Sequence, residues 1–276
     1  MMNRWNKFSA ETEQRLFTAI DEDDIADEHV SLPDTINLQC TEENIRANYG
    51  LCLQYWEDGF TRAELLRLVL KQLRNGGLSK QERMQYKYIR SRYKHLRFAL
   101  RLYSRKHKAP LWFAKTTVFL GRFQDAFKNK NQEHINFYGK LLRVYLSIPV
   151  WMLVRYSLRH IRMESVKDFI AYRQQQMRDL QTLIAKPQLT GREFHDVRKI
   201  ISQQVSYYDT LRSIDPANHE AQQVSRFLAA INGIMGDKHD DMVADDLAGV
   251  KAYSDPAPLD ADLRQRLELL LARYPL

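Results

Sequence analysis

Glycine and cysteine are scarce in this chain of 276 residues. Ten glycines leave few of the tight turns that a many-stranded sheet needs. The two cysteines, Cys40 and Cys52, have neither the spacing of a metal-binding pair nor the number that a disulfide framework requires. No segment shows a sustained alternation of apolar and polar residues. The sequence therefore predicts an all-α fold.

A long uninterrupted apolar run is also missing. The most apolar stretch, residues 141–158, is broken by Arg143, Pro149 and Arg155. We expect a buried helix pair there and no association with a membrane. The first residues are not followed by the apolar core of a signal peptide, which predicts a cytoplasmic protein.

Acidic residues are nearly absent from the middle of the chain. Residues 83–199 hold 26 Lys and Arg against 7 Asp and Glu, a net charge of +19, whereas residues 1–82 carry −6 and residues 200–276 carry −5. Between Arg83 and Gln124 there is no acidic residue at all, against 12 Lys and Arg. A basic middle between acidic ends indicates a localised site for a polyanion.

Start and stop signals divide the chain into three parts. We expect an acidic N-terminal extension (1–44, with the run Asp21–Asp24), a helical domain of two repeats (45–250), and a linker with a short last helix (251–276). Three capping boxes pair Thr61 with Glu64, Ser79 with Glu82 and Thr190 with Glu193. The predicted helices cover 42–56, 61–74, 79–106, 110–129, 132–147, 150–162, 165–184, 190–212, 216–235, 238–250 and 260–273.

The helix that begins at Ser79 carries two stripes. Its cations follow one another at intervals of 4, 3, 4, 3 and 4 residues, which places them on one face: Arg83, Lys87, Arg90, Lys94, Arg97 and Arg101. An apolar stripe one residue away predicts the buried face: Tyr86, Ile89, Tyr93, Leu96, Leu100 and Tyr103. Like charges at these intervals repel one another, and a bound polyanion would offset that repulsion.

The chain repeats this scheme further on. The helix after Thr190 places His195 and Arg198, with Lys199 beside them, next to an apolar stripe. A shift of 108 residues aligns Lys87 with His195 and Arg90 with Arg198. Each basic helix is followed by an element of the form apolar-Gly-x-x-polar-Asp, at Leu120–Asp125 and at Met235–Asp240. Such a repeat predicts two similar helical halves that face each other.

At these residues the chain resembles the CHAD family, the conserved histidine α-helical domain, over roughly residues 45–250. The family's His-x-x-Arg helix and later Leu-Gly-x-x-(His/Arg)-Asp element match the second half best, at His195, Arg198, Gly236, His239 and Asp240. In the first half, the basic run (with Arg90, Lys94, His95, Leu96 and Arg97), Leu120-Gly121 and Asp125 match. The resemblance implies two pseudo-symmetric four-helix bundles with a basic cavity between them. It also implies binding of inorganic polyphosphate and association with polyphosphate granules.

The chain departs from the family pattern at several positions. Lys87 stands in place of the first histidine, and Gln124 stands where an Arg is usual. Ser202, Gln203 and Val205 occupy positions that often carry cations, so we expect the first basic helix to dominate binding. His195 has the register of a ligand contact, whereas Asp125, His239 and Asp240 are expected to support the motifs.

We therefore expect a binding protein without catalysis, cofactor or metal. Its phosphate-binding residues would be Arg83, Lys87, Arg90, Lys94, His95, Arg97, Arg101, His195, Arg198 and Lys199. One alternative is a metal-dependent phosphohydrolase that uses the pairs His195-Asp196 and His239-Asp240, although no His pair at helical spacing supports it. Another is a nucleic-acid-binding protein, which the predicted burial of the tyrosines disfavours. Self-association stays open.

Overall fold

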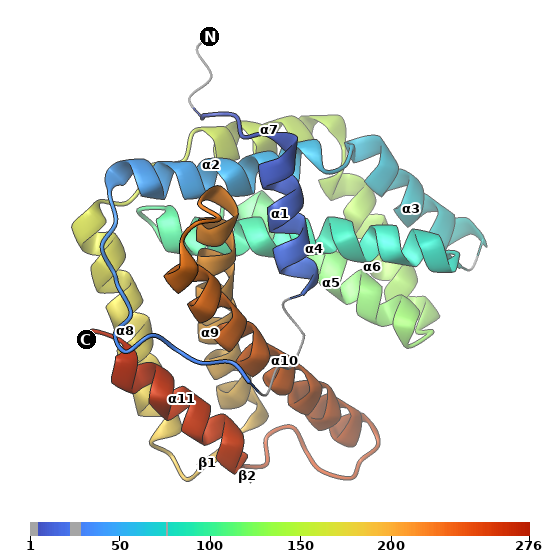
Figure 1. The fold of residues 1–276 in the computed structure, drawn as a ribbon. Helices are drawn as coiled ribbons and strands as arrows, with labels where there is room; N and C mark the ends of the chain where they lie inside the picture. The colour runs from blue at the N-terminus through green and yellow to red at the C-terminus, as the bar shows by residue number, and fades with distance from the viewer. Residues whose placement is uncertain (1–4, 23–28, 76) are drawn as a thin grey trace. The chain divides into compact units, whose positions relative to one another are not determined.

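The computed structural model describes residues 5–22, 29–75 and 77–276, and these form an all-α fold, as predicted (Figure 1). The first six helices are α1 (Ala10–Asp21), α2 (Glu42–Asp58), α3 (Arg62–Asn75), α4 (Lys80–Tyr103), α5 (Leu111–Lys128) and α6 (Gln132–Tyr145). The others are α7 (Ile148–Arg159), α8 (Val166–Ile184), α9 (Gly191–Ile214), α10 (His219–Leu247) and α11 (Ala261–Arg273). Two short strands, β1 (Gln188–Leu189) and β2 (Ala257–Pro258), pair antiparallel.

The helices divide into two compact units. The first unit comprises the described residues of Met1–Phe8 and Ile45–Glu164, and so contains most of α2 and all of α3 to α7. The second unit comprises the described residues of Ser9–Asn44 and Ser165–Leu276, and contains α1, α8, α9, α10 and α11. Each of the two predicted basic helices thus lies in a unit of its own, α4 in the first and α9 in the second.

An aromatic cluster forms the core of the first unit. The buried indole of Trp56 lies edge-on to the rings of Tyr93 and Phe113, and these two rings stack on each other at 5.3 Å. Phe60 and Trp151 close the cluster around the same indole. Truncation of such a buried ring costs about 3–5 kcal/mol, so this cluster fixes α4 against α2, α5 and α7.

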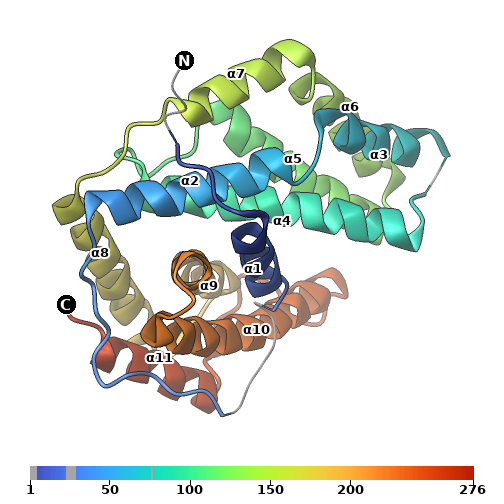
Figure 2. The same cartoon turned by 45° about the horizontal axis from the view of Figure 1, so that its top comes forward.

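The second unit is built around α9 and α10, which pack directly against each other (Figure 2). The predicted N-terminal extension is wrong for residues 10–21, because α1 packs on α9 in this unit. Leu16 is fully buried there, and Nε of Arg15 donates to the carbonyl of Ser213 at 3.0 Å. The acidic run was expected at Asp21–Asp24, but Asp23 and Asp24 lie outside the described residues.

The C-terminal part is also integrated into the second unit. Helix α11 packs against α8 and α10 through its buried leucines, Leu263, Leu267 and Leu270. The two helices predicted at 216–235 and 238–250 form the single helix α10, which continues through Gly236. All three predicted capping boxes are confirmed, since the hydroxyl and carboxylate bonds of Thr61–Glu64, Ser79–Glu82 and Thr190–Glu193 are all present.

The predicted buried helix pair at residues 141–158 is only half right. Helices α6 and α7 bury Leu142, Leu146, Val154 and Leu158, but their outer side chains are exposed, among them Val144, Ile148 and Met152. Among the described residues no single helix has the length and apolarity to cross a membrane. By length and composition alone, α6 and α7 pass that test as a pair, bent by 68° between them.

Candidate functional site

Helix α4 buries the predicted apolar stripe and leaves the cationic stripe at or near the surface. Every member of the apolar stripe, from Tyr86 to Tyr103, is at most 2% exposed. Arg83, Lys87 and Lys94 are exposed, whereas Arg90, Arg97 and Arg101 are half-buried. The offset of one residue between the stripes therefore places three guanidinium groups along the border of the core.

Most of these cations have no acidic partner. No carboxylate of the described residues lies within 4.0 Å of the charged groups of Arg83, Lys87, Arg90, Arg97 or Arg101. Burial and the neighbouring charge of Arg101 lower the pKa of Arg97. A guanidinium stays protonated at neutral pH, so two like charges remain close together and partly desolvated. An anion between them would relieve this repulsion.

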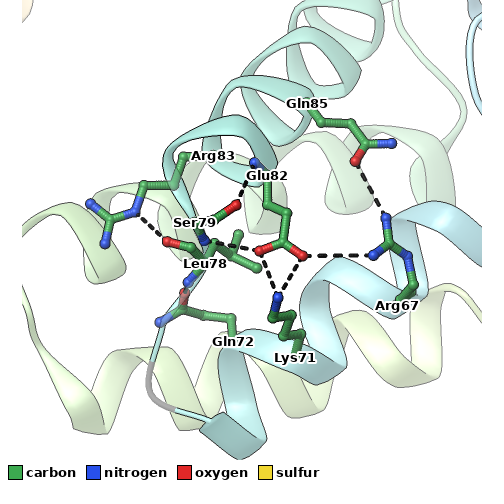
Figure 3. A network of polar contacts seen from close by, with 8 residues as sticks. All are labelled: Arg67, Lys71, Gln72, Leu78, Ser79, Glu82, Arg83 and Gln85. Atoms are coloured by element: carbon green, nitrogen blue, oxygen red, sulfur yellow. Dashed lines mark hydrogen bonds and ion pairs between the residues drawn. The ribbon is translucent and has the colours of Figure 1, made fainter.

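The first turn of α4 shows the opposite arrangement (Figure 3). Glu82 accepts from Nζ of Lys71 at 2.7 Å and from the amide of Ser79 at 2.9 Å, and Arg67 lies 3.7 Å away. The hydrogen bond from Lys71 and those from Ser79 lower the pKa of Glu82 to about 2. Lys71 and Arg67 are thus already paired with an acid, unlike most cations of the α4 stripe.

In the first unit, Arg90 joins the basic helix to the apolar-Gly-x-x-polar-Asp element on α5. Nη1 of Arg90 donates to Oε1 of Gln124 at 3.3 Å. A β-carbon added at Gly121 would lie 3.5 Å from Nη2 of the same guanidinium. Tyr86 donates its hydroxyl to the carbonyl of Leu120 at 3.0 Å. The glycine lets α5 come close to the arginine, and the arginine is held at the edge of the core.

The second unit repeats this contact. A β-carbon at Gly236 of α10 would lie 3.1 Å from Nη2 of Arg198 on α9. The pairs Arg90–Gly121 and Arg198–Gly236 are the residues that the predicted repeat aligns, so the repeat is present in local geometry as well as in sequence. The contact between an arginine and a helical glycine could be recognised from the sequence only by comparing the two halves.

Two histidines lie together in the second unit. The rings of His195 and His239 are 5.1 Å apart, and Nε2 of His239 shares a hydrogen bond of 3.0 Å with the hydroxyl of Tyr253. Nδ1 of His195 is buried and has no hydrogen-bond partner among the described residues. Burial, then Lys199 and His239, lower the pKa of His195 to about 4. Burial and Arg198 also lower the pKa of His239. Sequence reasoning missed Tyr253.

His95 is the one candidate that the structure removes from the ligand-binding set. Its side chain is only 4% exposed and lies edge-on to the ring of Tyr55 at 6.1 Å. Burial lowers its pKa to about 3, with smaller effects from Lys94 and Arg92, so the imidazole is neutral at physiological pH. The prediction that His95 binds phosphate is wrong because this position faces the core between the cations on either side.

Helix α9 offers fewer free cations than α4. Lys199 donates to Oδ1 of Asp196 at 2.8 Å. The next turn is buried at Ser202, Gln203 and Val205, where the family pattern often carries cations. The motif aspartates do not hold the arginines: Asp125 makes no side-chain bond to any described residue, and Asp240 lies 3.8 Å from Nδ1 of His239.

The chemistry of a metal centre is not assembled in the part of the chain that the structure describes. No group of three or more His, Cys, Asp or Glu side chains there could hold an ion. Comparison with known proteins adds no assignment, because no protein-family model, curated protein or solved structure matches the chain.

Proposed function

We propose that the protein binds inorganic polyphosphate without catalysing a reaction on it, and that α4 supplies most of the contacts. The observation that carries this proposal is the row of five α4 cations without an acidic partner among the described residues. A linear polymer with one negative charge or more per phosphate could follow such a row along the helix. The CHAD resemblance supports polyphosphate in particular, and with it a cytoplasmic location at polyphosphate granules.

The adjacent histidines keep metal-dependent phosphohydrolysis as a second candidate. His195 and His239 come from different helices, yet their rings are 5.1 Å apart. Nucleic acid is a weaker candidate, since the aromatic residues of the α4 apolar stripe are buried and cannot stack on bases.

Charge reversal on α4 tests the proposal. Lys87→Glu with Lys94→Glu changes two exposed residues and so leaves the core in place, whereas reversal of Arg90 or Arg97 would disturb half-buried side chains. We expect the affinity for labelled polyphosphate to fall by at least about a hundredfold, since each lost phosphate contact and each new repulsion acts in the same direction. The matched control, Lys128→Glu with Lys167→Glu, makes the same charge change on exposed residues of α5 and α8 and should bind nearly as the wild type does.

The same samples separate the candidates. Equal losses in both variants would contradict the proposal, since binding would then follow net charge alone. Tighter binding of duplex DNA than of polyphosphate would favour the nucleic-acid reading. Phosphate release in the presence of Mn²⁺, Mg²⁺ or Zn²⁺ that disappears in His239→Ala would establish hydrolysis.

A further inference from the structure

Helices α6 and α7 expose large apolar side chains in regular rows. Phe137 and Val144 lie seven residues apart on α6, and Ile148, Met152 and Tyr156 follow at intervals of four on α7. These five side chains are between 56% and 63% exposed. Residues at such spacings share one side of a helix, so each helix presents exposed apolar side chains on one side.

Helix α5 extends this surface. Leu111 is 66% exposed and Trp112 is 38% exposed at the start of α5. The ring of Trp112 lies 5.0 Å from that of Tyr145 on α6, which joins the two helices at the surface. We name these seven residues the α5–α7 face: Leu111, Trp112, Phe137, Val144, Ile148, Met152 and Tyr156.

The segment that carries the α5–α7 face is rich in cations and poor in acids. Residues 111–160 contain 8 Lys and Arg against 2 Asp and Glu. Lys115, Lys140 and Arg143 are exposed and form no ion pair with any acid that the structure describes. Two copies of this surface would repel each other. An anionic layer with an apolar interior would match both its charge and its apolar rows.

The buried sides of α6 and α7 limit how deeply these helices could enter a bilayer. Ile135, Leu142, Val154 and Leu158 are buried in the first unit, so a helix pair that crossed a bilayer would have to abandon this core. Arg155 and Arg159 also hold Glu57, at 3.4 and 2.8 Å. A position in the headgroup region keeps all of these contacts.

We propose that the α5–α7 face lies on a membrane surface that contains anionic phospholipids. Its aliphatic side chains enter the boundary between headgroups and acyl chains, and Trp112 and Tyr156 take the interfacial level that amphipathic rings prefer. The long side chains of Lys115, Lys140 and Arg143 reach the lipid phosphates. This proposal differs from the sequence-based expectation of no membrane, and it does not depend on polyphosphate binding.

Sedimentation with vesicles tests the proposal. The wild type should bind vesicles of equal parts phosphatidylcholine and phosphatidylglycerol, and bind phosphatidylcholine alone weakly. Ile148→Glu with Met152→Glu should lower the partition coefficient by about tenfold for each side chain removed from the lipid. The matched control is Val243→Glu with Leu247→Glu, which changes two exposed apolar residues of α10 in the same way and should bind as the wild type does.

Two results would overturn the proposal. One is unchanged vesicle binding in the α7 variant together with its loss in Lys87→Glu with Lys94→Glu, because lipid would then bind only through α4. The other is a wild-type dimer that ignores vesicles and becomes a monomer in the α7 variant, because a second copy would then cover the face. Circular dichroism of each variant confirms that the helices persist.

Discussion

Helices α4 and α9 have the same local structure but differ in the charge of their exposed faces. Both are 24 residues long, both begin with a capping box, and both place an arginine over a glycine of the next long helix. The cationic stripe of α4 holds five cations without an acidic partner among the described residues. In α9 one cation pairs with Asp196, and the next turn is buried. The caps and the glycine contact set where the helix lies, and the exposed face sets what it can bind.

The salt dependence of binding gives the largest contrast between the two helices. If α4 cations replace condensed counterions, log affinity should fall with log salt by roughly 0.7–0.9 per phosphate contact. Six contacts would cost several orders of magnitude between low and moderate salt. Lys87→Glu with Lys94→Glu should flatten this slope, whereas Arg198→Gln with Lys199→Gln should change it little. A titration series in increasing salt measures both slopes, and a shallow wild-type slope would mean that charge does not hold the ligand.

The stability of the protein should fall in acid because His95 is buried in its neutral form. Its pKa is about 3 in the folded protein and 6.5 in the unfolded chain, so the unfolded state binds the extra proton between these values. The stability contributed by neutral His95 is complete above pH 6.5 and is lost as the pH falls toward 3, by about 1.4 kcal/mol per pH unit. Urea unfolding at stepped pH measures this slope, which His95→Gln should reduce. An equal slope in His95→Gln would show that other groups cause it.

The pH dependence of binding should come mainly from His195 on α9. His195 has a pKa of about 4 in the free protein, and a bound anion would raise it. Affinity should therefore increase as the pH falls below the bound-state pKa, by about tenfold per pH unit at most, and level off near pH 4. His195→Gln should remove this gain and keep the salt slope. The same gain in His195→Gln would place the titrating group elsewhere.

Alanine at the two repeat glycines should give the smallest and most direct comparison. At Gly121 the new β-carbon would meet Arg90 at an ordinary 3.5 Å, so the helix preference of alanine should raise stability by roughly 0.5–1 kcal/mol. At Gly236 the distance to Arg198 is 3.1 Å, so the guanidinium must move and the gain should shrink or reverse. Thermal unfolding of both variants measures the difference. Equal gains would mean that the tighter contact has no cost.

The sequence predicted the structure correctly where the residues of a single helix determine which side chains are buried and where the helix begins. The periodicity of α4 predicted its buried stripe and its cationic stripe residue by residue, and the three capping boxes marked three helix starts. The sequence failed to predict burial or contacts that depend on a second element. His95 stands within the cationic run, yet packing against Tyr55 buries it. Leu16 gave no sign that α1 has a partner almost two hundred residues away, and Tyr253 meets His239 only because the chain turns back after α10.

The pairing of α1 with α9 also bears on how the chain folds as it is made. The bond from Arg15 to Ser213 joins residues 198 positions apart. At about 5–20 residues per second, synthesis leaves α1 without α9 for roughly 10–40 s, during which all of Ile45–Glu164 emerges. The first unit can then assemble while the second waits for its last helices. A nascent chain stalled before α9 would therefore carry a folded first unit and an α1 that still exposes Leu16.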